Sequence, residues 1–135
     1  MAKHPYILLP GSEATYRPYI QMGLSNPHNQ KQTPRIRGLI DSGANVCLAS
    51  RDIALWLGIQ LDQKEDTIPI GTANGTTSDA VKKTVILMTE AGRYECPFFF
   101  IDGISPDEPP LLGQLGFFDH FKVCFDWEHK TSEII

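Results

Sequence analysis

The sequence has no long hydrophobic run, and this excludes a protein that crosses a membrane with helices. No apolar stretch reaches the roughly 18 residues that a membrane-spanning helix needs. The segment 6–9 is apolar, but Pro10 and Gly11 end it before it attains the layout of a secretory signal. We therefore expect a cytoplasmic protein without a membrane partner.

Cysteine is scarce as well. Cys47, Cys96 and Cys124 are odd in number, form no Cys-x-x-Cys pair and have apolar neighbours, a pattern that favours buried free thiols over a zinc ligand or a nucleophile. The four histidines show no ligand spacing with one another or with the cysteines. We expect neither a metal nor a cofactor.

Positive charge is also limited. Twelve Lys and Arg stand against sixteen Asp and Glu, which gives a net charge of −4, and the basic residues are scattered. Because nucleic-acid affinity depends on clustered positive charge, we expect no nucleic-acid partner.

Glycine and proline, in contrast, are abundant. Eleven Gly and ten Pro interrupt the 135 residues too often for a helical bundle, so the sequence predicts a mainly β protein. The length suits a single domain over residues 1–135.

Short strands separated by turn signals follow along the chain. One clear helix of about two turns is expected after Ser50, a typical N-cap residue, with Gly58 as its stop. Pro97 indicates an edge position or a bulge in its strand, and a short helical turn is expected near Phe118. The predicted strands cover residues 18–24, 35–40, 46–49, 81–88 and 94–101, an apolar stretch from 109 cut by Gly113, and a final hairpin of 121–126 with 131–135.

A long hairpin is predicted over residues 66–77. Asn74 and Gly75 stand between two β-prone arms, and Asn-Gly is a strong signal for a tight hairpin turn. The residues near the tip are small and polar, so we expect the tip to stand away from the core.

The candidate catalytic site of the sequence is the run Leu39-Ile40-Asp41-Ser42-Gly43-Ala44. Asp41 ends an aliphatic strand, which would hold its carboxylate at the rim of the core. Ser42 can hydrogen-bond across a turn, and Gly43 allows a close backbone approach. Taken alone, Asp-Ser-Gly is also a common turn tripeptide.

Three motifs in this order resemble a retropepsin-like aspartic protease of the single-domain cellular or bacterial type, over residues 18–135. They are the Asp41 run, the hairpin with Thr72-Ala73-Asn74-Gly75, and Pro110-Leu111-Leu112-Gly113. The resemblance implies a closed β-barrel with one or two short helices that acts as a homodimer on polypeptide substrates. It implies Asp41 as the catalytic carboxylate, Ser42, Gly43 and Ala44 as support for the active-site loop, Thr72, Ala73, Asn74 and Gly75 as a flap, and Leu112 and Gly113 as the strand that packs beside the loop. Gln114 and Leu115 depart from the Arg and acidic residue of many viral members, so no ion pair is assumed there.

Peptide hydrolysis by carboxylates requires two of them with one shared proton. This chain has a single Asp-Ser-Gly, and a two-fold homodimer would supply the second copy of Asp41. The apolar edge formed by Phe121, Val123, Phe125 and 134–135 has no evident partner in the sequence and is the expected interface. The alternatives are a catalytically silent binding or dimerisation module of the same fold, or an unrelated β-barrel or sandwich.

Overall fold

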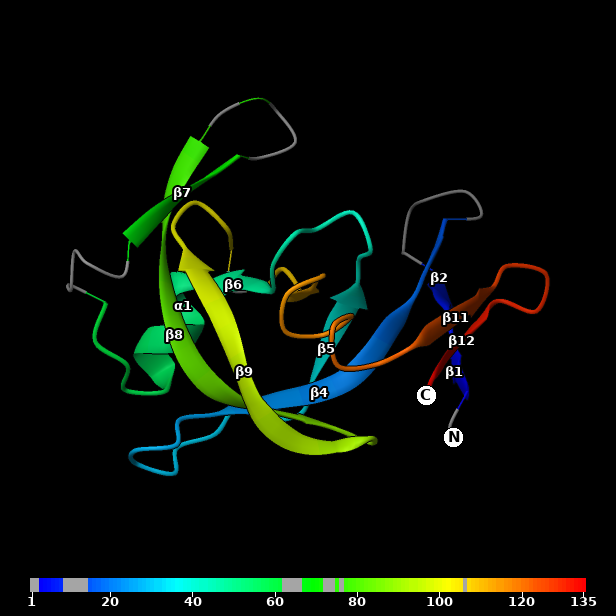
Figure 1. Ribbon diagram of the computed structural model, residues 1–135, viewed down its shortest axis with the longest axis horizontal. Helices are drawn as coiled ribbons and strands as arrows, with labels where there is room; N and C mark the ends of the chain where they lie inside the picture. The colour runs from blue at the N-terminus through cyan, green and yellow to red at the C-terminus, as the bar shows by residue number, and fades with distance from the viewer. Residues whose placement is uncertain (1–2, 9–14, 62–66, 72–74, 76, 106) are drawn as a thin grey trace.

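The computed structural model describes residues 3–8, 15–61, 67–71, 75, 77–105 and 107–135. Its elements are mostly short strands, with two long ones in the middle of the chain (Figure 1). The strands are β1 (Lys3–Pro5), β2 (Ile7–Leu8), β3 (Tyr16–Arg17), β4 (Tyr19–Ser25), β5 (Ile36–Ile40), β6 (Leu48–Ser50), β7 (Thr67–Gly71), β8 (Thr77–Thr89), β9 (Gly92–Ile101), β10 (Leu111–Leu112), β11 (Val123–Asp126) and β12 (Thr131–Ile134), and the helix is α1 (Arg51–Trp56).

The main sheet closes into a six-stranded barrel. Its strand order is β4-β5-β10-β6-β9-β8-β7, and an additional pairing of β4 with β8 joins the two sides. The closing register runs from Gly23 opposite Met88 to Ser25 opposite Ile86. The expectation of a mainly β, closed barrel is therefore confirmed.

Strand β10 is short but central to the arrangement. It runs parallel to β5, with Leu112 opposite Ile40, and antiparallel to β6, with Leu111 opposite Leu48. Leu112 and Ile40 are both buried. This pairing fixes the end of β5, and hence the start of the loop at Asp41, against the chain some 70 residues later.

The predicted helix is present with the expected cap. The Ser50 hydroxyl accepts a hydrogen bond from the Asp52 N–H at 3.2 Å, and Gly58 follows the helix with a φ of +72°. The second expected helical turn is instead a series of turns over residues 116–120. Pro97 lies opposite Thr84 in β8, while pairing with β6 begins only at Phe99, so its missing N–H removes no bond to β6.

A second, three-stranded sheet joins the two ends of the chain, with order β1-β12-β11. Its N-terminal strand was not predicted. The assignment of Phe121, Val123 and Ile134 to a surface without partners was wrong, because all three pack on the chain's own core. Phe125 and Ile135 remain exposed, by 44% and 47%.

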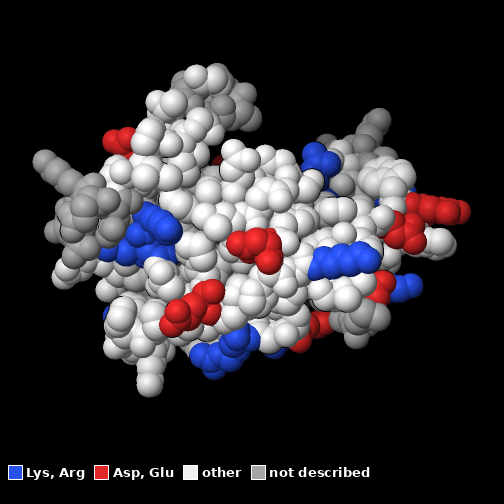
Figure 2. Space-filling view, viewed as in Figure 1, with Lys and Arg blue, Asp and Glu red and all other residues white. Residues whose placement is uncertain are grey.

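The charged surface is mixed. On the face shown in Figure 2, acidic and basic side chains are interspersed and neither sign forms a continuous patch. No helix of the described chain is long and apolar enough to cross a bilayer.

The cysteines divide into a buried pair and an exposed one. Cys47 and Cys96 are fully buried, whereas Cys124 is exposed, which corrects the expectation that all three would be buried. The hydrogen bond with Cys47, and then burial, raises the pKa of the Cys96 thiol. Cys96 is therefore held as an unreactive thiol at neutral pH.

This division predicts a simple thiol count. In the native protein we expect an aromatic disulfide reagent to modify Cys124 rapidly, while Cys47 and Cys96 react only after denaturation. The measurement is the absorbance of released thiolate before and after addition of guanidinium chloride. Rapid native modification of two or three thiols would contradict the burial of the pair.

Candidate active site

Asp41 lies directly after β5 in a tight turn. Its N–H donates to the Leu112 carbonyl at 3.0 Å, and its own carbonyl accepts the Ala44 N–H at 3.1 Å. One carboxylate oxygen, Oδ1, accepts the Gly43 N–H at 2.9 Å. Within the described residues the other oxygen, Oδ2, has no hydrogen-bond partner. The side chain is thus oriented by its own loop and keeps one oxygen available.

Gly113 packs directly against the backbone of this loop. A Cβ at this position would contact the Val46 carbonyl oxygen and would lie 2.7 Å from that of Ala44. Its N–H points to the Cys47 sulfur at 3.4 Å. Backbone meets backbone here, and only a residue without a side chain fits.

Gln114 makes a contact that the sequence did not reveal. Its side-chain amide donates to the Ser42 carbonyl at 2.6 Å, and its backbone N–H donates to the Ala44 carbonyl at 2.8 Å. The Leu115 N–H continues the ladder to Asn45 at 2.9 Å. Three hydrogen bonds from residues 114–115 therefore hold the loop 42–45. Within the described chain the Ser42 hydroxyl is exposed and has no hydrogen-bond partner.

The loop opens onto a cavity of about 820 Å³. Asp41, Gly43 and Ala44 form one wall, and residues 68–71 of β7 form another. The end of β9 and the segment that follows it contribute further lining, and β6, β8 and β10 contribute one residue each. The lining residues are Asp41, 43–46, Leu48, 68–71, Ser78, 101–104 and Leu111. A groove of this size with a carboxylate at its wall suits an extended ligand.

Only part of the predicted hairpin tip is described. Thr72, Ala73 and Asn74 lie outside the described residues. Gly75 has a φ of +83°, a conformation that favours glycine, and nothing described lies within 4 Å of a Cβ built there. The arm β7 pairs with β8 from Thr67 opposite Val81 to Gly71 opposite Thr77.

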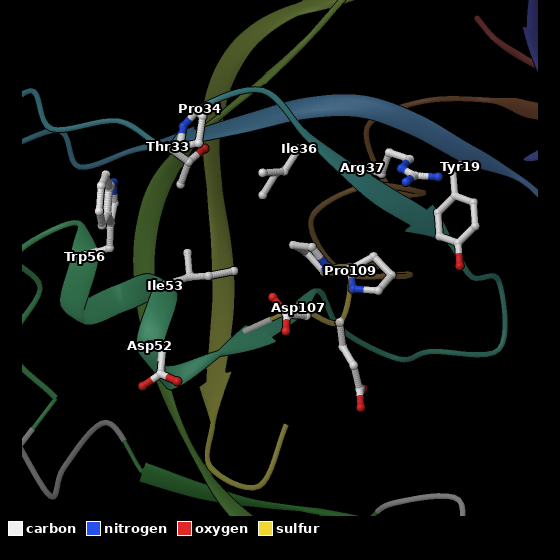
Figure 3. Close-up of a pocket in the computed structure, with 12 residues that line it drawn as sticks. Tyr19, Thr33, Pro34, Ile36, Arg37, Asp52, Ile53, Trp56, Asp107 and Pro109 are labelled. Carbon is white, nitrogen blue, oxygen red and sulfur yellow. The ribbon is translucent and has the colours of Figure 1, made fainter. Parts of the chain in front are cut away.

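A second cavity, of about 670 Å³, lies between α1, β5 and the segment 107–110 (Figure 3). It shares no lining residue with the Asp41 cavity. Pro110 borders one cavity and Leu111 the other, so this short segment separates them.

No metal centre is apparent in the part of the chain that the structure describes. None of its His, Cys, Asp and Glu side chains form a group of three or more suited to an ion.

Comparison with known proteins places the fold. No protein-family model matches the sequence, and no curated protein matches it. Among solved structures, a retropepsin-like aspartic protease from Rickettsia conorii is similar over 100% of this chain and 99% of its own, with 19% identity and a TM-score of 0.62. The protease of simian foamy virus (mac) aligns with 71% of this chain and 87% of its own, with 14% identity and a TM-score of 0.43. The chain has the retropepsin-like fold.

Proposed function

We propose that the protein is an aspartic endopeptidase that hydrolyses peptide bonds in polypeptide substrates. The observation that carries this proposal is the Asp41 carboxylate, oriented by Gly43 and facing a large groove within a retropepsin-like fold. Fold alone does not establish activity, and the proposal rests on this geometry together with the chemistry of carboxylates.

The proposed reaction requires a pair of carboxylates. One accepts a proton from the attacking water, and the other donates a proton to the carbonyl oxygen of the scissile bond. At a separation of roughly 3 Å two carboxylates cannot both ionise, so the pair holds one proton. This chain supplies one such group, Asp41, and a two-fold homodimer would supply the other. The active-site loop would then meet its symmetry copy.

The sheet of the chain termini offers the surface for that dimer. Strand β11 is at its edge, where unpaired backbone groups are open to another chain. Exposed apolar side chains of this sheet, its turn and the residue after β12 are Phe125 (44%), Trp127 (60%) and Ile135 (47%). They are the kind of surface that association covers.

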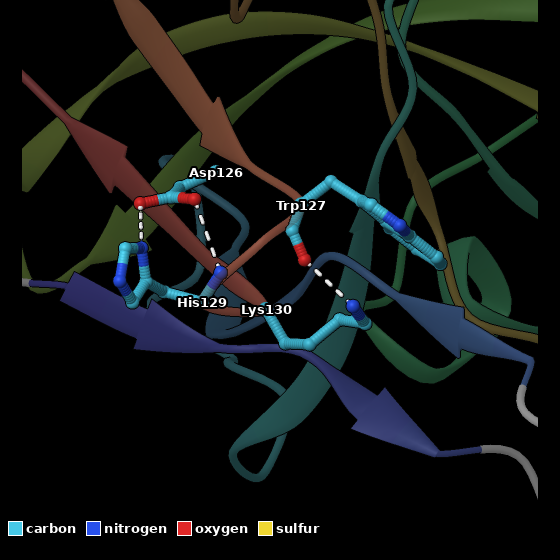
Figure 4. A network of polar contacts seen from close by, with 4 residues as sticks. All are labelled: Asp126, Trp127, His129 and Lys130. Atoms are coloured by element: carbon cyan, nitrogen blue, oxygen red, sulfur yellow. Dashed lines mark hydrogen bonds and ion pairs between the residues drawn. The ribbon is translucent and has the colours of Figure 1, made fainter.

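Hydrogen bonds within the turn between β11 and β12 stabilise the conformation of this surface (Figure 4). Asp126 accepts the backbone N–H of His129 at 3.1 Å and contacts its ring nitrogen at 2.7 Å, and these bonds lower the pKa of Asp126. The Lys130 ammonium donates to the Trp127 carbonyl at 2.7 Å and lies 3.9 Å from the centre of the Trp127 ring.

The hairpin of β7 and β8 would act as a flap over bound substrate. Residues 68–71 already line the Asp41 groove, and Gly71 pairs with Thr77 at the described end of the hairpin. A flap excludes water and holds the peptide against the carboxylates.

A dilution series tests the function and the shared site together. With a mixture of unstructured peptides as substrate, we expect hydrolysis whose specific activity falls as the enzyme is diluted below the dimer dissociation constant. Product is measured by mass spectrometry, and association by analytical ultracentrifugation at the same concentrations.

Two outcomes would contradict the proposal. Constant specific activity in a protein shown to be monomeric would exclude a site shared between subunits. A stable dimer that cleaves no peptide would instead favour a silent module of the same fold.

A further inference from the structure

The cavity of Figure 3 is a groove with an apolar floor and aromatic ends. Ile36, Ile53 and Pro109 are half-buried and form its middle. Trp56 and Tyr19 stand at its opposite ends (Figure 3). Trp56 is 65% exposed, an unusual position for so large an apolar ring. Its Nε1 donates to the Gln32 carbonyl at 3.4 Å, a long hydrogen bond.

Three carboxylates border the same groove. Asp52 comes from the first turn of α1, and Asp107 and Glu108 come from the segment before β10. Asp52 and Asp107 lie along one side of the apolar floor (Figure 3). The backbone positions the segment, because the Asp107 N–H bonds the Ser105 hydroxyl at 3.2 Å and the Glu108 N–H bonds the Ser105 carbonyl at 3.0 Å.

These carboxylates have no counter-charge of their own in the described chain. No ion pair joins any of the three to a described cation. Arg51, next to Asp52, contacts Asp102 instead at 3.7 Å. Arg37, which also borders the groove, lies 5.9 Å from the centre of the Tyr19 ring at the opposite end from α1. The groove therefore combines apolar surface with unbalanced negative charge.

We propose that this groove binds an extended peptide segment in which a large apolar side chain is followed by Lys or Arg. The apolar side chain would fill the space between Trp56, Ile53 and Ile36, and the cation would meet Asp52, Asp107 and Glu108. Charge complementarity selects this occupant, because the carboxylates repel phosphates and acidic peptides. The inference does not depend on hydrolysis at Asp41, since the two cavities share no lining residue.

The test uses the fluorescence of Trp56 to report binding in the groove. The sequence contains two tryptophans, so Trp127→Phe leaves Trp56 alone, and Asp41→Asn in the same protein prevents cleavage of the probe. The probe is a blocked octapeptide with one leucine followed by two lysines. Its matched control has two glutamates in place of the lysines. Binding is followed by Trp56 emission and by isothermal titration calorimetry.

Neutral variants localise the binding. The triple substitution Asp52→Asn, Asp107→Asn, Glu108→Gln should weaken the lysine peptide by about tenfold, because each exposed pair contributes a modest share. The control triple Asp79→Asn, Glu95→Gln, Glu128→Gln removes the same charge from exposed sites outside the groove and should change affinity by less than about twofold.

The expected result is binding of the lysine peptide, with a change in Trp56 emission, at least about tenfold tighter than the glutamate peptide. Equal binding of the two peptides, or full affinity in the groove triple variant, would overturn the proposal. Failure of the lysine peptide to bind would do the same. Loss of self-association in a Trp56→Ala protein would assign the groove to a contact between two copies and would also overturn it.

Discussion

Replacement of Asp41 by Asn should abolish peptide hydrolysis while leaving the fold intact. The Asn side-chain oxygen can still accept the Gly43 N–H, which in the native loop is 2.9 Å from Asp41 Oδ1. An amide cannot share a proton between two subunits, so the chemistry of the pair is lost. We expect activity to fall by about a thousandfold or more.

The control for this variant is another carboxylate of the same groove. Asp102 lines the cavity and is exposed, with a surface ion pair to Arg51 at 3.7 Å. Such pairs contribute little, so Asp102→Asn should retain activity within a few-fold. Both proteins are purified identically and compared by peptide turnover, circular dichroism and sedimentation.

Inhibitors distinguish an aspartic mechanism of this protein from the activity of a contaminating protease. Activity of the native protein should be blocked by substrate mimics that carry a hydroxyl in place of the scissile carbonyl, and should survive metal chelators and thiol reagents. Full activity in Asp41→Asn, or native activity removed by a chelator, would exclude the aspartic mechanism.

The strands were predictable where they are long and alternate. Residues 18–24 and 35–40 became β4 and β5, and the hairpin signal became β7 and β8. The short strands β1, β2 and β3 were missed because two or three residues carry no periodic pattern. Their structure depends on pairing with distant segments, such as β1 with β12.

The errors near the C-terminus arose because the sequence did not show which face of the final hairpin each residue occupies. Apolar neighbours in sequence suggested that Cys124 was buried and that Val123 and Ile134 faced a partner. Neighbouring residues of a strand point to opposite faces, so Val123 packs on the core while Cys124 is exposed. Composition indicated the apolar residues, and only the three-dimensional packing showed which side each one covers.

The candidate site was predictable only in its local part. The Asp41 loop is a continuous motif and was predicted from the run 39–44. The contact of Gln114 with the Ser42 carbonyl joins residues 72 positions apart, and no spacing rule predicts it. The same is true of the groove beside Trp56, whose carboxylates come from α1 and from the segment before β10.

Gly113 should tolerate no side chain. In Gly113→Ala the new Cβ would contact the Val46 carbonyl oxygen and lie 2.7 Å from the Ala44 oxygen. Both are backbone atoms of the active-site loop, so relief requires the loop or β10 to move. Overpacking of this kind costs about 2 kcal/mol or more in the free energy of unfolding. Because the loop carries Asp41, a displacement of about 1 Å should also lower turnover by about a hundredfold.

A matched glycine distinguishes this strain from a general effect of alanine. No atom of the described residues lies within 4 Å of a Cβ built on Gly71, and its φ is outside the positive range. Gly71→Ala should therefore change the free energy of unfolding by less than about 0.5 kcal/mol. Urea unfolding of both variants gives the comparison, and peptide turnover gives the effect on Asp41. If Gly113→Ala were as stable as Gly71→Ala and fully active, the close approach of residues 112–115 to the loop would not be what holds the carboxylate in place.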